Sequence, residues 1–264
     1  MGREWSVVVR IWVVVSLLAL AGCYEPEPKP QMTGEEQSVT LPPAQAPPAR
    51  HELIGRSAQG RPIMIQVAGR GEDTTLVMAA IHGNEPAGVV LVNQLEEYLQ
   101  SNPRALEGRR VVMLPVTNPD GLAAGTRENA HAIDLNRNFD ASNRVNSGTN
   151  GHTALSEPEA RALQTIIKDY HPNRIVSIHQ PLTCIDYDGP ARALATRMAQ
   201  YCDLPIKKLG AKPGSLGAYC GEELNIPTIT FELPDGADKQ SAIVLWDHYG
   251  KSILAAIMYP QHPL

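Results

Sequence analysis

Short apolar runs, rich in valine and isoleucine, recur along the chain between turn residues and segments of a different period. Several of these runs lack the polar alternation of a strand with one face in water, so we expect strands buried on both faces. The predicted strands are Pro62–Ala68, Thr75–Ile81, Arg110–Val116, Arg174–Ile178 and Thr228–Leu233.

Apolar residues at helical spacing occupy the stretches between these runs. Pro86 suits the first position of a helix, and Ser156 with Glu159 has the arrangement of a capping box. The predicted helices are Pro86–Gln100, a segment from Ser156 to Tyr170, Pro190–Cys202 and Ser241–Tyr259. This alternation predicts an α/β fold, a three-layer sandwich with a mixed, mostly parallel central sheet and helices on both faces.

Polar side chains stand where several predicted strands end. His82, Asn118 and His179 each follow a strand, and Glu232 lies near the end of another. Reactive residues of open α/β sheets gather at the carboxyl ends of the strands. We therefore expect these side chains to meet at one edge of the sheet.

Residues 1–22 are predicted to be a lipoprotein signal peptide. Arg3 and Arg10 flank the start, and the apolar run that ends at Leu20 is short for a membrane-spanning helix. Small residues followed by Cys23 resemble a bacterial lipoprotein signal, in which that cysteine is lipidated and becomes the first mature residue. A plain secretory signal, or a short membrane anchor, is the alternative.

Residues 23–50 are rich in Pro, Gln, Glu and Ala, with seven prolines between residues 24 and 50. Such a composition builds no core and stiffens the chain into extended conformations, so we expect a tether. A proline-rich recognition segment is the alternative. Residues 51–264 remain for one folded domain with a sizeable core.

The overall charge excludes one class of partner. The chain has 23 basic and 28 acidic residues, a formal charge of −5, and no lysine–arginine block, so we expect no nucleic-acid binding. Beyond Cys23 the cysteines are Cys184, Cys202 and Cys220, with no C-x-x-C pair among them. In an oxidising compartment two of the three would be able to pair, and the sequence leaves open which two.

The segment "HGNE" carries the first candidate metal ligands, His82 and Glu85. Gly83 permits a tight bend between them, but a lone H-x-x-E pair is more typical of an ordinary turn than of a metal site. His179 at a second strand end favours a catalytic zinc site, which takes three protein ligands. The remaining histidines are expected to be solvated or structural: His51, His131, His152, His171, His248 and His262.

Further motifs follow in order: "NPDG" (118–121), "GTR" (125–127), "DLNRNF" (134–139) and "TFELP" (230–234). Together with "HGNE" and "IHQ" they resemble the zinc metallocarboxypeptidase family, over nearly all of the chain from His51. "HQPLTCIDYDGPA" and "GSLGAYCG" resemble most its bacterial murein peptide amidase branch. The resemblance implies a zinc carboxypeptidase-like fold and a catalytic domain over residues 51–264.

The resemblance also implies roles for individual residues. It assigns His82, Glu85 and His179 to one Zn²⁺ per chain, and Glu232 to the general base. It assigns Arg127 to stabilising the oxyanion. A surface glutamate for Glu232 and a surface salt bridge for Arg127 are the alternatives.

The substrate side of the site follows from the same resemblance. Asn136 and Arg137 match the clamp on a terminal carboxylate, with a salt bridge as the alternative for Arg137. Asp134 matches a carboxylate that orients a zinc-bound histidine, with simple strand capping as the alternative. The position that sets side-chain preference corresponds to Leu216.

The chain departs from the family at one position of the substrate pocket. A mobile tyrosine of digestive-type members corresponds to Leu209, and Tyr187 or Tyr219 is a candidate to replace it. Asp186 and Asp188 are candidates to bind the amine of a diaminopimelate side chain, with an acidic surface loop as the alternative.

These features predict a zinc-dependent peptidase or amidase acting on peptidoglycan stem peptides, at the bond between γ-D-glutamate and meso-diaminopimelate. The alternatives are an N-acyl amino acid deacylase of the succinylglutamate desuccinylase and aspartoacylase type, or a non-catalytic lipoprotein that binds peptide or zinc. We expect a lipid-anchored protein of the cell envelope. Because Tyr24 rather than aspartate follows Cys23, the outer membrane of a Gram-negative host is favoured, with the protein on its periplasmic side.

Overall fold

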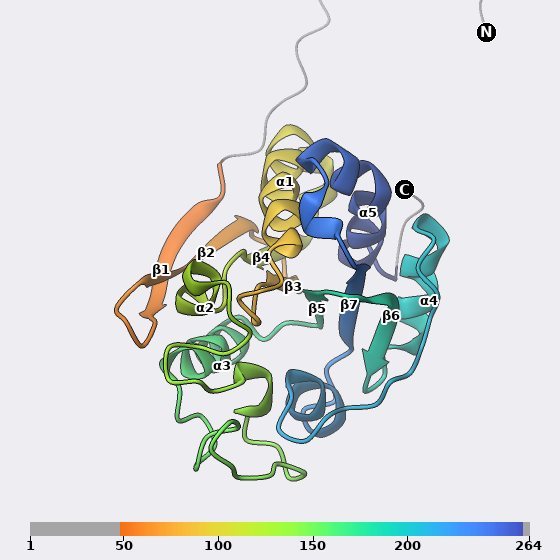
Figure 1. The fold of residues 1–264 in the computed structure, drawn as a ribbon. Helices are drawn as coiled ribbons and strands as arrows, with labels where there is room; N and C mark the ends of the chain where they lie inside the picture. The colour runs from red at the N-terminus through yellow and green to blue at the C-terminus, as the bar shows by residue number, and fades with distance from the viewer. Residues whose placement is uncertain (1–47, 261–264) are drawn as a thin grey trace, which may run out of the picture. The chain divides into compact units, whose positions relative to one another are not determined.

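One mixed sheet of seven strands organises the computed structural model, which describes residues 48–260 (Figure 1). The strand order is β1-β2-β4-β3-β5-β7-β6. The strands are β1 (Arg50–Arg56), β2 (Pro62–Gly69), β3 (Asp73–Ala79), β4 (Arg109–Leu114), β5 (Arg174–His179), β6 (Leu182–Asp188) and β7 (Thr228–Pro234). The predicted signal peptide and Cys23, and nearly all of the predicted tether, lie outside the described residues.

The sheet is mixed, as predicted, but it is not mostly parallel, because only three of its six strand pairings, those at the centre, are parallel. β4, β3, β5 and β7 pair in parallel, whereas β1 with β2, β2 with β4, and β6 with β7 pair antiparallel. The five predicted strands are all present. β1 and β6 were not predicted, because each lies at an edge of the sheet and carries polar side chains between its apolar ones.

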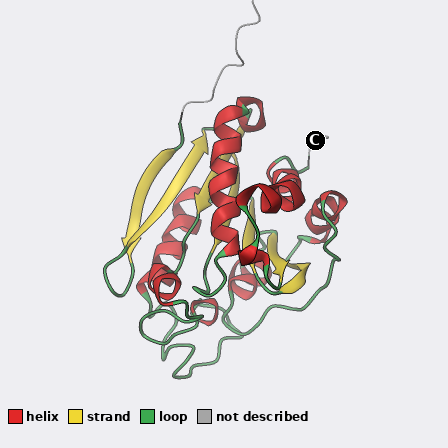
Figure 2. Cartoon of the chain, turned by 45° about the horizontal axis from the view of Figure 1, so that its top comes forward, coloured by secondary structure: helices red, strands yellow, loops and turns green. Residues whose placement is uncertain are grey.

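Helices cover both faces of the sheet, which gives the predicted three layers (Figures 1 and 2). One face of the sheet forms an apolar cluster with three helices, α1 (Ala87–Ser101), α4 (Arg192–Met198) and α5 (Ala242–Ile257). The opposite face forms a second apolar cluster with α3 (Pro158–Tyr170). The short α2 (Pro119–Ala124) follows β4. None of the helices within residues 48–260 is long and apolar enough to cross a membrane.

The predicted capping box is wrong. Glu159 is fully buried, and its carboxylate accepts hydrogen bonds from Ala58 N (3.0 Å) and Asn129 Nδ2 (3.0 Å). It therefore joins two loops to α3 instead of reaching back to Ser156. Pro86 lies one residue before the first helical residue of α1.

No disulfide joins the three cysteines of the described part. Cys184 and Cys220 are buried, Cys202 is partly buried, and all three are free.

The loop after β3, residues 80–86, carries His82 and Glu85 and is held by the loop after β4. Thr117 N and Asn118 N donate to the carbonyl oxygens of Ala79 (3.1 Å) and Ala80 (2.9 Å). The bend begins at Ala80, whose φ of 48° is left-handed, so β3 ends two residues earlier than predicted. Asn118 is fully buried and caps α2 by accepting from Gly121 N, so its side chain holds this loop and does not line the cavity described below.

Gly83 allows these two loops to pack closely, a role that the sequence did not indicate. A Cβ atom at Gly83 would lie 1.9 Å from the backbone carbon of Gly121, far inside van der Waals contact. The glycine is therefore required by the close approach of two loops, whereas the left-handed residue of the bend is Ala80.

We expect Gly83→Ala to lower the free energy of unfolding by about 2–4 kcal/mol, because the added methyl forces two backbones apart. Urea unfolding of the two proteins measures this difference. Gly148→Ala is the matched control, since a Cβ atom there meets nothing within 4 Å. Equal stability of Gly83→Ala and the control would contradict the proposed packing constraint.

Candidate active site

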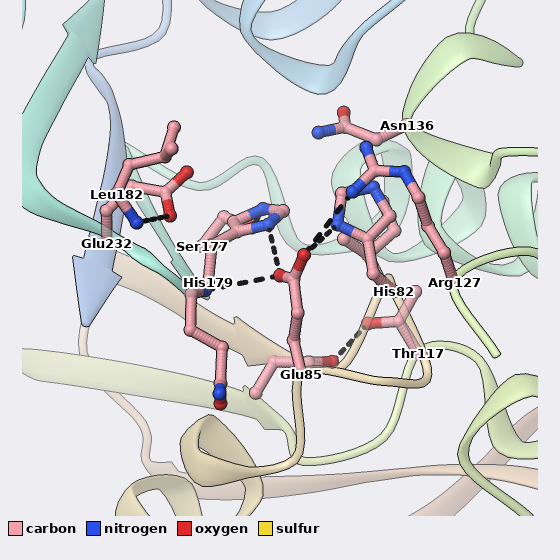
Figure 3. A network of polar contacts seen from close by, with 12 residues as sticks. His82, Glu85, Thr117, Arg127, Asn136, Ser177, His179, Leu182 and Glu232 are labelled. Carbon is pink, nitrogen blue, oxygen red and sulfur yellow. Dashed lines mark hydrogen bonds and ion pairs between the residues drawn. The ribbon is translucent and has the colours of Figure 1, made fainter. Parts of the chain in front are cut away.

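The carboxylate of Glu85 lies between the imidazole rings of His82 and His179 (Figure 3). Its Oε1 is 2.8 Å from Nδ1 of His82, and its Oε2 is 2.9 Å from Nδ1 of His179. The backbone N–H of Gln180 also donates to Oε2, at 3.3 Å. All three side chains are buried. The structure thus brings together the three residues that the sequence predicted as metal ligands.

The outer nitrogen of each ring has its own partner. Nε2 of His82 lies 3.2 Å from Oδ1 of Asp134, and Nε2 of His179 lies 3.0 Å from Oγ of Ser177. These contacts fix both rings with Nδ1 toward Glu85. Ser177 was not predicted, although its place two residues before His179 on one strand puts both side chains on the same face.

Charge around Glu85 keeps it ionised. Burial opposes ionisation, but hydrogen bonds from His179 and His82 lower the pKa of Glu85 to about 2. Burial also opposes the charged form of His82, which lowers its pKa. Contacts with Asp134 and Glu85 outweigh that effect, so the pKa of His82 is raised. The group therefore has a carboxylate acceptor and two oriented imidazoles at neutral pH.

These donors fit a zinc ion. One ligand atom from each of His82, Glu85 and His179 lies within 4.8 Å of the others. Two imidazole nitrogens and a carboxylate oxygen are zinc's preferred ligands in catalytic sites, and three protein ligands leave a position for water or substrate. Contacts to the outer nitrogens, such as those of Asp134 and Ser177, are typical of metal-binding histidines.

Asp134 connects His82 to Arg127. Its Oδ2 accepts from Nε (3.1 Å) and Nη2 (3.0 Å) of Arg127, and its Oδ1 accepts from Asn136 N (2.9 Å). Burial opposes ionisation, yet His82, Arg127 and Arg137 lower the pKa of Asp134 below its ordinary value. Asp134 therefore contacts the outer nitrogen of His82 and also caps a short helix, not a strand.

Arg127 and Glu232 lie on opposite sides of the His–Glu–His group (Figure 3). Arg127 Nη1 is 3.4 Å from Oε1 of Glu85. Glu232, on β7, pairs in register with His179 on β5, and its Oε2 accepts from Leu182 N at 3.3 Å. Burial and the charge of Glu85 raise the pKa of Glu232, against the opposing effect of His179. Glu232 is thus a buried carboxylate with an increased proton affinity, not a surface residue.

A cavity of about 430 Å³ opens over this group. Ten of the residues predicted for the site line it: His82, Glu85, Arg127, Asn136, Arg137, His179, Asp186, Asp188, Leu216 and Glu232. The lining also includes residues that were not predicted, among them Asn84, Gln180, Lys212 and Asp235. Asn84 and Gln180 lie within the motifs "HGNE" and "IHQ", but nothing in the sequence assigned these two residues, Lys212 or Asp235 to the wall of a cavity.

The carboxylate clamp predicted from sequence lies on a 3₁₀ turn, Leu135–Arg137. Oδ1 of Asn136 accepts from the N–H of Leu216 at 2.8 Å, which joins this turn to the segment Gly217–Glu223. Burial lowers the pKa of Arg137, although its ordinary value is high enough to keep it charged. An amide and a guanidinium side chain therefore both line the cavity.

The two predicted amine-binding aspartates differ. Oδ1 of Asp186 accepts from Leu209 N (2.8 Å) and Tyr187 N (2.9 Å), so this carboxylate holds a loop. Oδ1 of Asp188 is buried and receives no hydrogen bond within residues 48–260. Neither is part of an exposed acidic loop.

No tyrosine takes the place of the family's mobile one among the residues that line the cavity. Leu209 lines it and is 41% exposed. Tyr219 stacks on Phe139 in the core, and Tyr187 lies under Lys208. Neither ring lines the cavity in this structure, so it supports neither suggestion from the sequence.

Comparison with known proteins finds similarity to one family. The sequence profile of the zinc carboxypeptidase family matches residues 44–189. Murein peptide amidase A of Escherichia coli (strain K12) is 36% identical over 218 aligned residues, covering 75% of this chain and 87% of that protein. The Vibrio campbellii (strain ATCC BAA-1116) protein of the same name is 33% identical over 204 residues, covering 68% and 77%.

Solved structures show the same fold. The crystal structure of murein-tripeptide amidase from Escherichia coli O157 matches with a TM-score of 0.68 and 30% identity, covering 84% of this chain and 95% of that one. Carboxypeptidase A from Helicoverpa armigera matches with a TM-score of 0.65 at 20% identity, covering 81% and 70%, which is a likeness of fold alone.

Ionisation of Asp188 makes the stability of the folded protein depend on pH. Burial, with the nearby charges of Asp186 and Glu222, raises the pKa of Asp188 to about 6, although Lys208 opposes the shift. In the unfolded chain the carboxyl of Asp188 ionises near pH 4. The stabilising contribution of the protonated acid is therefore complete below about pH 4 and is lost as the pH rises through about 6.

We expect Asp188→Asn to be more stable than the wild type at pH 8, by roughly 1 kcal/mol after screening by water in the cavity, and nearly equal to it at pH 4.5. Urea unfolding at the two pH values measures the difference. Asp235→Asn, which removes the same charge from an exposed position in the lining, should give a smaller change at pH 8. A variant destabilised at pH 8 would show that the carboxylate is stabilised there.

Proposed function

This chain belongs to the zinc carboxypeptidase family, and we propose that it hydrolyses peptidoglycan stem peptides at the bond between γ-D-glutamate and meso-diaminopimelate. It is a peptide hydrolase by family. The choice of substrate is supported by one observation above all, the similarity to murein peptide amidase A over 87% of that protein's length. The cavity with its His82–Glu85–His179 group and Glu232 supplies the chemistry.

His82, Glu85 and His179 would hold the zinc ion. Bound there, Zn²⁺ supplies Lewis-acid chemistry, polarising a carbonyl oxygen and lowering the pKa of water toward about 7. Asp134 and Ser177 contact the outer nitrogens of the two rings and so hold each ring with Nδ1 toward Glu85. Gln180 and Arg127 direct their N–H groups at the oxygens of Glu85 and so restrict its rotation.

Glu232 is placed to move the proton. Its carboxylate takes a proton from the attacking water, whose hydroxyl joins the acyl carbon, and delivers that proton to the amine nitrogen as the C–N bond breaks. A carboxyl with a raised pKa suits this transfer, because it holds the proton between the two steps.

Cationic and amide groups face the other parts of the substrate. Arg127, across the group from Glu232, lies where a guanidinium can stabilise charge that develops on the carbonyl oxygen. Asn136 and Arg137 would bind the terminal carboxylate of the leaving residue, for which the forked geometry of arginine is suited. Each of these residues lines the same cavity.

The substrate proposal is tested with the zinc-loaded full-length chain in detergent. We expect release of diaminopimelate from L-Ala-γ-D-Glu-meso-diaminopimelate, measured by chromatography, and much slower turnover of ordinary C-terminal peptides and N-acyl amino acids. Turnover of the N-acyl amino acids alone would instead identify a deacylase. Absence of turnover with every substrate, at full zinc occupancy, would indicate a binding protein.

Glu232→Gln is the control variant for this experiment. It keeps the size and one acceptor oxygen of the side chain but removes the proton acceptor, so kcat should fall by about 10²–10⁴-fold with zinc content unchanged. Full activity in a zinc-loaded Glu232→Gln protein would assign the base to another residue.

We also propose that the protein is anchored by lipid at Cys23 and acts in the cell envelope, on the periplasmic side of the outer membrane in a Gram-negative host. The support is the sequence pattern at residues 1–23. Cells fed with labelled palmitate should incorporate label into the wild-type chain and none into Cys23→Ala. Equal labelling of the two would eliminate this anchor.

A further inference from the structure

The loop that carries Arg127 and Asp134 contains no helix or strand. It spans residues 125–134, between α2 and the Leu135–Arg137 turn. The two side chains meet through a pair of hydrogen bonds, and Arg127 also reaches Glu85 beside the cavity (Figure 3). The position of the guanidinium therefore depends on what gives this loop its shape.

The side chain of Asn129 folds the loop back on itself. Its Oδ1 accepts hydrogen bonds from the N–H groups of His131 (3.0 Å) and Ile133 (3.2 Å). The backbone N–H of Asn129 donates to the carbonyl oxygen of Ile133 at 3.0 Å. These bonds reverse the chain between Arg127 and Asp134 and so bring the two residues into contact.

The amide nitrogen of Asn129 ties the loop to the start of α3. Its Nδ2 donates to Oε2 of Glu157 (2.7 Å) and to Oε2 of Glu159 (3.0 Å). Glu157 is the residue before α3, and Glu159 lies in its first turn. The apolar face of α3 packs in the core, so the loop is held by a helix that is itself fixed.

The two glutamates are buried and depend on this donor. Glu157 and Asn129 are each 5% exposed, and Glu159 is fully buried. Burial opposes the ionisation of Glu157, yet hydrogen bonds, led by that of Asn129, lower its pKa. Asn129 also supplies the bond to Oε2 of Glu159 that water would otherwise make.

Asparagine is the side chain that these partners require. Two backbone N–H groups need an acceptor, and two carboxylates need a donor, at opposite ends of one planar group. Aspartate would place an oxygen against both glutamates, and alanine would leave both ends unpaired. Asn129 does not line the cavity, so its substitution releases the loop without changing the cavity wall directly.

The carboxylate clamp, Asn136 and Arg137, is tied to α3 by a different residue. Asn138 follows the clamp in the chain, and its Oδ1 accepts from the N–H of Glu157 at 3.1 Å. This bond remains when the side chain of Asn129 is lost. The loop beside the metal-binding group should then move while the clamp stays in place.

We propose that Asn129 is a positioning residue of the enzyme. By tying its loop to the start of α3, it holds the guanidinium of Arg127 at the cavity. The inference rests on the proposed function for the role of Arg127 at the developing oxyanion. Because a misplacement of about 1 Å can cost about 100-fold in rate, a tie outside the cavity can control the reaction.

Hydrogen exchange tests this role without a substrate. In the zinc-loaded full-length chain in detergent, the amides of residues 126–134 should be protected, and Asn129→Ala should accelerate their exchange at least about tenfold. Mass spectrometry of peptides measures the rates. Asn173→Ala is the matched control, since it removes an asparagine bond to Thr74 N (2.7 Å) at the end of β5 away from the cavity.

Asn129→Asp is a second variant, which leaves no cavity in the core. It keeps the oxygen that accepts from the loop but turns an oxygen toward two carboxylates, so the same segment should exchange faster. Unchanged protection of residues 126–134 in either folded variant would overturn the inference. Rapid exchange of this segment in the wild type would do the same, and that measurement needs no variant.

A double-mutant cycle tests whether Asn129 acts through Arg127. Asn129→Ala should lower kcat on the stem peptide by about 10–100-fold and change KM by less than about threefold, with zinc content unchanged. Arg127→Ala should lower kcat by about 10²–10³-fold. In the Arg127→Ala background, Asn129→Ala should cost less than about twofold, because the group that it misplaces is already gone. Equal costs in the two backgrounds would show a merely structural role.

The outcomes separate this inference from the proposed function. If the stem peptide is not cleaved, the proposed substrate fails, and the cycle is run on a C-terminal peptide that the enzyme does cleave. If no peptide is cleaved, hydrogen exchange alone decides the role of Asn129. If the stem peptide is cleaved but the exchange or the cycle gives the contrary result, the role of Asn129 fails alone.

Discussion

The bonds to the carboxylate of Glu85 are the interactions on which the active site depends. Four donors converge on its two oxygens, from His82, His179, Arg127 and the backbone of Gln180. These donors come from the loop after β3, from β5 and the residue after it, and from the segment before the Leu135–Arg137 turn. Loss of this single side chain would leave two buried imidazoles and a guanidinium without their common acceptor, and the edge of the sheet would lose its electrostatic balance.

The order of the strands makes this convergence possible. β3, β5 and β7 are parallel neighbours, so the chain returns to the same edge each time one of them ends. His82 and His179 are nearly a hundred residues apart along the chain, and Glu232 follows after fifty more, yet the latter two are register partners. The helices that connect the strands contribute little chemistry, and their apolar faces hold the strands in this order.

The central strands and the convergence of His82, Glu85 and His179 were predictable because the strands leave local patterns and the three residues lie at or near strand ends, within motifs that resemble one family. A strand buried on both faces is a continuous apolar run, and a polar residue at its end is conspicuous. β1 and β6 leave no such pattern, since edge strands mix polar and apolar residues. The capping box at Ser156 failed because tertiary contacts with Ala58 and Asn129 outcompeted the local bond.

The different environments of Asp186 and Asp188 could not be predicted from local sequence patterns. The two residues have the same side chain, lie two apart on β6, and line one cavity. Only the fold shows that the backbone of Leu209 satisfies one of them and that two distant glycines leave room beside the other. Such a difference depends on residues 23 to 33 positions away in the chain, which no pattern within "DYDG" records.

The contact between Gly83 and Gly121 has a consequence for any attempt to redesign the metal loop. The two positions are 38 residues apart in the chain, yet it is backbone that meets backbone there, and neither residue has a side chain to trim. A larger residue at one position cannot be compensated by a smaller one at the other. The "HGNE" and "NPDG" segments therefore have to be transplanted, randomised or evolved as one unit.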